Sequence, residues 1–179
     1  MSRSVLQYRV GDTRSSVQAG FSVVILWFVT IGLPSTAATA NDYSGEVITV
    51  LDGNTIDVLH NGKTERIRLY GIACPEKGQP YGYGAKDATS LLSFALEVTL
   101  HLHGKDKHGR VLADVLLADG TNVNHELVKD GWCRWYQKYA PGDAALEKLE
   151  TEARQANRGL WVDPEPVPPW EWHQRRDVP

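Results

Sequence analysis

The sequence lacks three features that would narrow its class at once: an excess of positive charge, an apolar run long enough to span a membrane, and an internal repeat. Its 179 residues include 19 Lys and Arg against 22 Asp and Glu, a net charge of −3. Tight nucleic-acid binders depend on a basic surface, so this balance argues against tight, non-catalytic DNA coating. It does not exclude an enzyme with a locally basic cleft. With 42% apolar and 23% charged residues, the composition is that of one globular domain and indicates neither disorder nor a fibrous class.

The first 40 residues have the pattern of an export signal. Three arginines precede the apolar run 21–33, and the small residues 38–40 form a cleavage site. We predict that the mature chain begins at Asn41 and is exported to the periplasm or the medium. It then holds 16 basic and 21 acidic side chains, a net charge near −5, because the signal carries three Arg and one Asp. The alternative is an uncleaved membrane anchor, but a span needs about 20 apolar residues and this run is shorter.

The sequence contains only two cysteines, Cys74 and Cys133, and both lie in the predicted mature chain. In an oxidising compartment a cysteine pair is more often bridged than free. We therefore predict a disulfide between them. The alternative is a pair of buried thiols.

Short β-rich segments separated by turn residues make up the first half of the mature chain. The turn residues include Asp52-Gly53-Asn54-Thr55 and the hairpin signal Asn61-Gly62. Ile67 and Leu69 are expected on one side of a strand, with Arg66 and Arg68 on the other. Strands are predicted at residues 45–51, 56–59, 64–72, 98–103 and 111–117.

Three helices are predicted among and after these strands. The first covers 85–96, with Ala88, Leu91, Leu92 and Ala95 as its apolar stripe. The others cover 122–130 and, from a cap at Asp143, residues up to about 157. Residues 163–179 carry five prolines and are expected to form an extended Pro/Trp-rich tail. Five short antiparallel strands with glycine-rich bends and about three helices indicate an α+β, mainly β protein built on a Greek-key barrel of the OB type.

Two arginines and a glutamate stand beside turn residues in the order Arg68, Glu76, Arg110. Guanidinium groups form bidentate contacts with phosphate oxygens, and a carboxylate can accept a proton from water. Taken singly, each residue is as well explained by a surface ion pair or a solvated turn. Taken together, they indicate a site suited to attack on a phosphodiester.

Five ordered stretches between about Tyr43 and Val162 carry a family pattern: VITVLDGNTIDV, RIRLYGIACPE, GKDKHGRVLADV, NVNHELVKDGW and EARQANRGLW. In them the chain resembles the staphylococcal nuclease-like (thermonuclease) domain, here assigned to residues 41–162. The resemblance implies an OB-fold nuclease that uses calcium to hydrolyse DNA and RNA. It places the two catalytic arginines of the family on Arg68 and Arg110, and its catalytic glutamate on Glu76.

The resemblance also locates the calcium ligands of the family. Its two carboxylates fall on Asn54 and Ala73, and its backbone-carbonyl ligand falls on Cys74. Calcium takes six to eight oxygens, largely from carboxylates, so the loss of both acids predicts a weakened calcium site. Asp52 is the first candidate for a compensating ligand, and Asp106 is a second.

These observations favour an exported phosphodiesterase of the endonuclease type that hydrolyses DNA or RNA with reduced activity. We expect a monomer with no stable membrane association once the signal is cleaved. The alternative is a catalytically inactive OB-fold module that binds nucleic acid or a protein partner through the same groove. An enzyme of this type needs some divalent ion, whereas a binding module does not.

Overall fold

The computed structural model describes residues 42–176, with side chains as far as Trp172. The predicted export signal, and with it the choice between cleavage and a membrane anchor, lies outside the described residues. Within residues 42–176, none of the helices combines the length and the apolar character needed to cross a bilayer.

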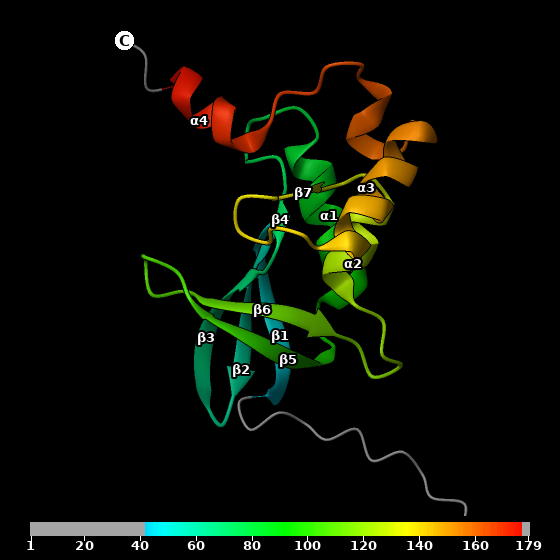
Figure 1. Ribbon diagram of the computed structural model, residues 1–179. Coiled ribbons are helices and arrows are strands. Elements are labelled where there is room, and N and C mark those ends of the chain that lie inside the picture. Colours follow the sequence, from blue (N-terminus) through cyan, green and yellow to red (C-terminus); the bar gives the residue numbers. More distant parts are fainter. Residues whose placement is uncertain (1–41, 177–179) are drawn as a thin grey trace, which may run out of the picture. The chain divides into compact units, whose positions relative to one another are not determined.

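Five strands close into a barrel in the order β1-β2-β3-β6-β5, with β5 pairing back onto β1 (Figure 1). The strands are β1 Tyr43–Asp52, β2 Thr55–His60, β3 Lys63–Leu69, β5 Glu97–Lys105 and β6 Val111–Leu116. The predicted five-stranded α+β barrel is confirmed. The pairing differs from the prediction at one place, because β3 and β6 run parallel and the other pairs are antiparallel.

The barrel core consists of side chains that point alternately into and out of the barrel along each strand. In β3, Ile67 and Leu69 are buried while Arg66 and Arg68 lie on the opposite side, as the pattern predicts. The β2–β3 hairpin turns at Asn61 and Gly62, whose φ angles of 49° and 74° are those that an Asn-Gly turn favours. The fully buried barrel side chains are Val47, Ile56, Val58, Ile67, Leu69, Val98, Leu100, Ala113 and Val115.

The predicted third strand is divided in two. It was expected to run through Ile72, but β3 ends at Leu69 because the chain turns at Tyr70 and Gly71, where Gly71 has φ 73°. The next residues form β4, Ile72–Ala73, which leaves the barrel and pairs with β7, Arg134–Trp135. This break carries the segment that follows β4 away from the barrel wall.

Three helices, α1 Gly82–Ser93, α2 Val123–Lys129 and α3 Ala144–Gln155, gather at one end of the barrel (Figure 1). Asn122 caps α2 and Asp143 caps α3 through their side chains, as expected from the sequence. The predicted apolar stripe of α1 holds only in part: Ala88 and Leu92 pack against the core, whereas Leu91 is 87% exposed and Ala95 lies beyond the end of the helix.

The buried face of α1 instead consists of small residues, Gly82, Ala85, Thr89 and Ser93. The helix approaches the β1–β2 turn so closely that a Cβ on Gly53 would lie 2.8 Å from the Cβ of Ala85. The Thr89 hydroxyl donates to the Gly53 carbonyl at 2.7 Å. Close approach and this buried hydrogen bond therefore determine which face of α1 is fully buried, and Leu91 remains exposed.

The tail is extended only as far as Pro168. A 3₁₀ turn, η1 Gly159–Val162, precedes it, and α4, Pro169–Arg176, follows it (Figure 1). The prediction of an extended tail over 163–179 is therefore wrong for the described residues from 169 onward. Proline suits the first turn of a helix because its fixed φ is helical and no N–H is lost there.

Candidate active site

The three residues singled out from the sequence line one cavity. Arg68 projects from β3, Glu76 lies in the segment after β4, and Arg110 lies just before β6. The cavity has a volume of about 580 Å³, and all three side chains contribute to its lining. Asp52, Asn54, Ala73 and Cys74 line the same cavity, whereas Asp106, the second candidate for a compensating ligand, is absent from its lining.

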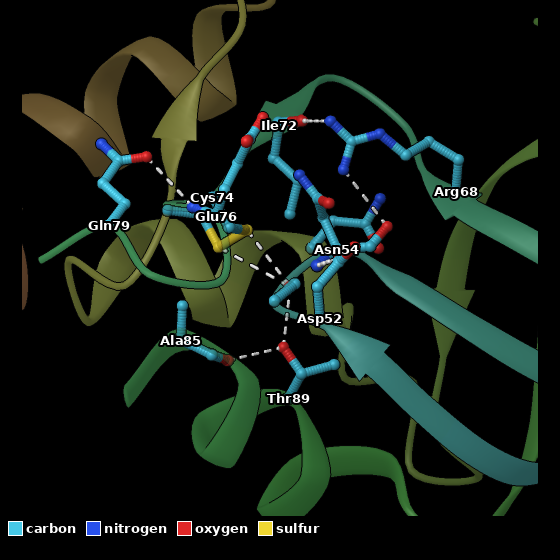
Figure 2. The surroundings of a disulfide bond; sticks show 12 residues. Asp52, Asn54, Arg68, Ile72, Cys74, Glu76, Gln79, Ala85 and Thr89 are labelled. Carbon is cyan, nitrogen blue, oxygen red and sulfur yellow. Dashed lines mark hydrogen bonds between the residues drawn. A yellow bond between two sulfur atoms is a disulfide. The ribbon is translucent and has the colours of Figure 1, made fainter. Parts of the chain in front are cut away.

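Arg68 is fixed by the backbone of the two turns beside it. Its guanidinium donates to the carbonyl oxygen of Asn54 at 3.4 Å and to that of Ile72 at 3.3 Å (Figure 2). Burial lowers the pKa of Arg68 to about 10; the nearby Arg110 acts in the same direction, and Asp52 opposes it. The side chain is still cationic at neutral pH, and its charge is only partly compensated by the protein.

Arg110 is held by the loop that carries it. Its Nε donates to Asp106 Oδ2 at 2.7 Å, while the backbone N–H groups of Arg110 and His108 donate to Oδ1 of the same carboxylate. Burial alone would raise the pKa of Asp106, but these hydrogen bonds outweigh it and lower that pKa. Because a guanidinium has five N–H donors, the pairing through Nε leaves Arg110 donors for an anion in the cavity.

Glu76 sits in a turn closed by Gln79. The Gln79 side chain accepts from the Glu76 backbone N–H at 3.1 Å, and the Gln79 N–H donates to the Glu76 carbonyl at 2.9 Å (Figure 2). Pro75, the residue before Glu76, has a φ angle that is fixed by its ring. At Gly82 an added Cβ would lie 2.0 Å from the Glu76 carbonyl oxygen, so the start of α1 presses directly on this turn. The backbone from which the Glu76 side chain projects is thus held from both sides.

A disulfide joins Cys74 to Cys133 behind the Glu76 turn (Figure 2). Cys74 Sγ lies 3.1 Å from the Gly53 carbonyl oxygen, the same oxygen that accepts from Thr89. The bridge therefore connects three pieces of the site: the β1–β2 turn, the segment that carries Glu76, and the segment between α2 and β7. In the chain-entropy model, a loop of this size contributes about 4 kcal/mol to the free energy of unfolding.

The oxygen donors of the cavity do not match a full calcium site. The side chains on offer are the carboxylates of Asp52 and Glu76, the amide of Asn54 and the hydroxyl of Thr55, while Ala73 presents a methyl group. Asp52 Oδ1 already accepts from the Asn54 N–H at 2.9 Å. Within residues 42–176, no group of three or more His, Cys, Asp or Glu side chains is placed to hold a metal. Two carboxylates fall short of what calcium normally takes.

The barrel surface beside the cavity is locally basic. A second groove of about 440 Å³ shares Arg68 and Arg110 with the cavity and adds Lys105, Lys107, His108 and Asp106, whose carboxylate pairs with Arg110. The net negative charge of the chain thus coexists with a cluster of cations around the two arginines. Attraction of a polyanion to such a site is local and does not need a basic molecule.

One wall of the cavity comes from residues that the sequence did not single out for the site. Pro169 and Trp170 of α4 line it together with Tyr136. Gln79, which links the Glu76 turn to the tail by donating to the Val167 carbonyl at 2.7 Å, was also missed. The available signal was the Pro-Pro-Trp run in the tail, because proline is favoured at the first position of a helix.

The barrel carries two arginines and a glutamate in one cavity, as a phosphodiesterase site would require. Comparison with known proteins identifies the family. The model of the staphylococcal nuclease homologue family matches residues 66–163, more than half of the chain. The chain therefore belongs to this family.

Three relatives match over most of their length. A protein of Escherichia coli named an uncharacterized endonuclease is 44% identical over 135 residues, covering 75% of this chain and 88% of the relative. The micrococcal nuclease of Shigella flexneri is 36% identical over 170 residues, covering 90% of this chain and 95% of the relative. Protein ParB of Escherichia coli is 36% identical over 146 residues, covering 74% and 82% respectively.

Proposed function

We propose that this protein is an endonuclease-type phosphodiesterase that hydrolyses DNA or RNA. The observation that carries the proposal is the meeting of Arg68, Glu76 and Arg110 in one cavity. Two relatives that match over most of their length are named an endonuclease and a micrococcal nuclease, which supports the same reaction class.

In the proposed reaction the bridging phosphate lies between the two guanidiniums, which balance the charge that builds up on the phosphoryl oxygens. The Glu76 carboxylate accepts a proton from a water molecule as its oxygen bonds to phosphorus. The ester bond on the opposite side of phosphorus breaks, and the leaving oxygen takes a proton from solvent. The repulsion between Arg68 and Arg110 is relieved when the phosphate binds, so the site favours an anion.

The proposal includes weak calcium binding and low activity. The family resemblance implies calcium, but the side-chain oxygen donors around Asp52 and Asn54 are fewer than calcium normally takes. Activity is expected to fall below that of a family member with acids at the positions of Asn54 and Ala73. Export to the periplasm or the medium is also part of the proposal, and the Cys74–Cys133 disulfide supports it because such bridges persist in oxidising compartments.

The decisive experiment is a cleavage assay on the protein purified after expression of the full chain. Labelled DNA and RNA oligonucleotides are incubated with and without calcium, and the products are resolved by length. We expect internal cleavage by the unmodified protein, and a loss of roughly 10²- to 10³-fold in Glu76→Gln and Arg68→Lys. Lysine keeps the charge of Arg68 but cannot reproduce its planar set of donors.

Arg66→Lys is the matched control, because Arg66 lies on the same strand and on the same side but pairs with Asp57 at 2.9 Å, outside the cavity. It should retain full activity. If the protein binds the oligonucleotides but cleaves them with none of the divalent ions tested, the result would contradict the proposal and favour the binding module. N-terminal sequencing of the purified protein tests the predicted start at Asn41.

A further inference from the structure

Gln79 makes hydrogen bonds to both of the peptide groups that flank the Cα atom of Glu76. Its side-chain oxygen accepts from the Glu76 N–H at 3.1 Å, and its own backbone N–H donates to the Glu76 carbonyl at 2.9 Å (Figure 2). Gly78, the third residue of this four-residue turn, has φ 86°, a conformation that glycine favours there. A residue has only two soft backbone dihedrals, so holding both flanking peptides fixes the direction of its Cα–Cβ bond. Gln79 therefore determines the direction in which the Glu76 side chain leaves the backbone.

The Gln79 side chain is itself held in one orientation. It is only 5% exposed, and its side-chain N–H donates to the Val167 carbonyl at 2.7 Å. An amide that accepts at its oxygen and donates at its nitrogen cannot be flipped without losing both hydrogen bonds. Val167 lies in the tail, beyond residue 163, where the family match ends. The geometry of the Glu76 turn thus depends on a segment outside the matched domain.

A second contact ties the same stretch of tail to the strand that precedes Glu76. The Arg134 guanidinium donates to the Pro166 carbonyl, which is one residue before the carbonyl that Gln79 binds. Arg134 is buried in β7 and is paired with Ala73 of β4, three residues before Glu76. The contacts therefore form a closed circuit that runs from β4 through β7, the tail and Gln79 to the Glu76 turn.

We propose that Gln79 is a positioning residue for the reaction, because by tying the Glu76 turn to the tail it holds the general base toward the phosphate. This inference rests on the proposed function and adds Gln79 and tail residues 166–167 to its machinery. Gln79 is absent from the described lining of the cavity, so its effect passes through Glu76. A displacement of about 1 Å in a reacting group can cost on the order of 100-fold in rate. The brace therefore affects turnover much more than it affects the binding of substrate.

The first test compares the steady-state cleavage of a labelled oligonucleotide by Gln79→Met and by the unmodified protein. Methionine is similar in length to glutamine but lacks the amide, so the Glu76 N–H and the Val167 carbonyl both lose this partner. We expect kcat to fall on the order of 10- to 100-fold, while KM stays within about twofold.

Asn122→Ala is the matched control. Asn122 also accepts from a backbone N–H through its side chain, that of His125 at the start of α2, and it is absent from the described lining of the cavity. Its removal should lower the melting temperature, because an N-cap is lost, and should leave kcat unchanged at a temperature where the variant is folded.

The same change in a Glu76→Gln background separates positioning from a loss of folded protein. Residues that act as a unit have non-additive effects, so Glu76→Gln with Gln79→Met should cleave as slowly as Glu76→Gln alone. An equal further fall in both backgrounds, a rise in KM without a loss of kcat, or an unchanged rate in Gln79→Met would each overturn the inference.

Hydrogen exchange tests the brace without any cleavage. In Gln79→Met, the amides of residues 76–79 and of the tail around Val167 should exchange faster together, whereas Asn122→Ala should change neither segment. Faster exchange in the turn alone would show that the tail is not coupled to it and would overturn the inference. If the unmodified protein cleaves no oligonucleotide, the proposed function fails, and the exchange pattern still decides whether Gln79 ties the Glu76 turn to the tail.

Discussion

At the scale of single residues, the site combines a complete set of phosphate-directed side chains with an incomplete set of metal ligands. Arg68 and Arg110 each have a dedicated anchor, the former on two backbone carbonyls and the latter on Asp106. The positions that the family resemblance assigns to calcium lack a full set of oxygen donors, since one of them is occupied by Ala73, whose side chain is a methyl group. On the proposed function, the chain has the side chains to hold a phosphate but lacks acids at two positions that the family resemblance assigns to calcium.

This contrast predicts that activity can be raised by restoring the acids. Asn54→Asp with Ala73→Asp should increase calcium-dependent cleavage strongly, because two carboxylates would join Asp52 around one dication. Ala73→Asp should contribute more than Asn54→Asp, because Asn54 already supplies an oxygen. Calorimetric titration with calcium and the initial rate of oligonucleotide cleavage are the measurements. Full calcium-dependent rates in the unmodified protein would contradict the prediction and direct attention to Asp52.

The residues of the site divide into those that the sequence could reveal and those that it could not. Arg68, Glu76 and Arg110 stand next to turns in a recognisable order, so their meeting was predictable. Trp170 and Gln79 were not, because their roles depend on how the tail returns to the Glu76 turn. That return is made by hydrogen bonds to the Pro166 and Val167 carbonyls, which leave no periodicity in the sequence.

At the scale of elements, the loop between β5 and β6 depends on one carboxylate. Asp106 accepts from two backbone N–H groups and from the Arg110 side chain, and its pKa is lowered in the folded state. A lowered folded pKa means that the contribution to stability is present above the unfolded pKa, near 4, and is lost as the pH falls through the folded value. The loop, and with it the placement of Arg110, should therefore weaken in acid.

The corresponding prediction concerns Asp106→Asn. The variant should be less stable than the unmodified protein at pH 7, and the difference in the free energy of unfolding should shrink below about pH 4, where Asp106 itself becomes protonated. Urea unfolding at several pH values measures the difference. A gap that stays constant between pH 7 and pH 3 would show that the charge of Asp106 plays no part.

The disulfide gives a second prediction at this scale. Its two cysteines are 59 residues apart, and replacing both with serine should lower the free energy of unfolding by about 4 kcal/mol. Activity should fall as well, because the bridge supports the turn that carries Glu76. Urea unfolding and cleavage rates, each with and without reductant, are the measurements. The double variant serves as the control because its behaviour should not respond to reductant, and an unmodified protein that is equally unresponsive would contradict the prediction.

Elements were predictable where local periodicity decides and unpredictable where close packing decides. The β2–β3 hairpin follows from Asn61-Gly62 and from alternation on either side. The buried face of α1 does not follow from its sequence, because contact with Gly53 and the Thr89 hydrogen bond override the position of Leu91. The parallel pairing of β3 with β6 likewise joins strands that are far apart in sequence, for which no turn signal exists.

At the scale of the whole molecule, the predicted mature chain is acidic while its site is basic. A net charge near −5 cannot attract a polyanion from a distance, so binding has to rest on the few cations around the cavity: Arg68, Lys77, Lys105, Lys107 and Arg110. Nucleic-acid affinity should therefore be modest and confined to a short stretch of backbone. This is the behaviour expected of an enzyme that releases its product, not of a protein that coats DNA.

The salt dependence of oligonucleotide binding measures how many phosphates the protein contacts. Each phosphate neutralised on a single strand contributes about −0.7 to the slope of log K against log salt, so three contacts predict a slope near −2. Anisotropy of a labelled oligonucleotide with Glu76→Gln, measured between low and moderate salt, gives the slope. Lys107→Gln should reduce its magnitude by about 0.7, whereas Lys148→Gln should leave it unchanged, since Lys148 lies on α3 beside Glu152 and outside both grooves. A slope steeper than about −5 would mean that many more phosphates are held, and the acidic surface would then have to be bridged by ions or by a partner.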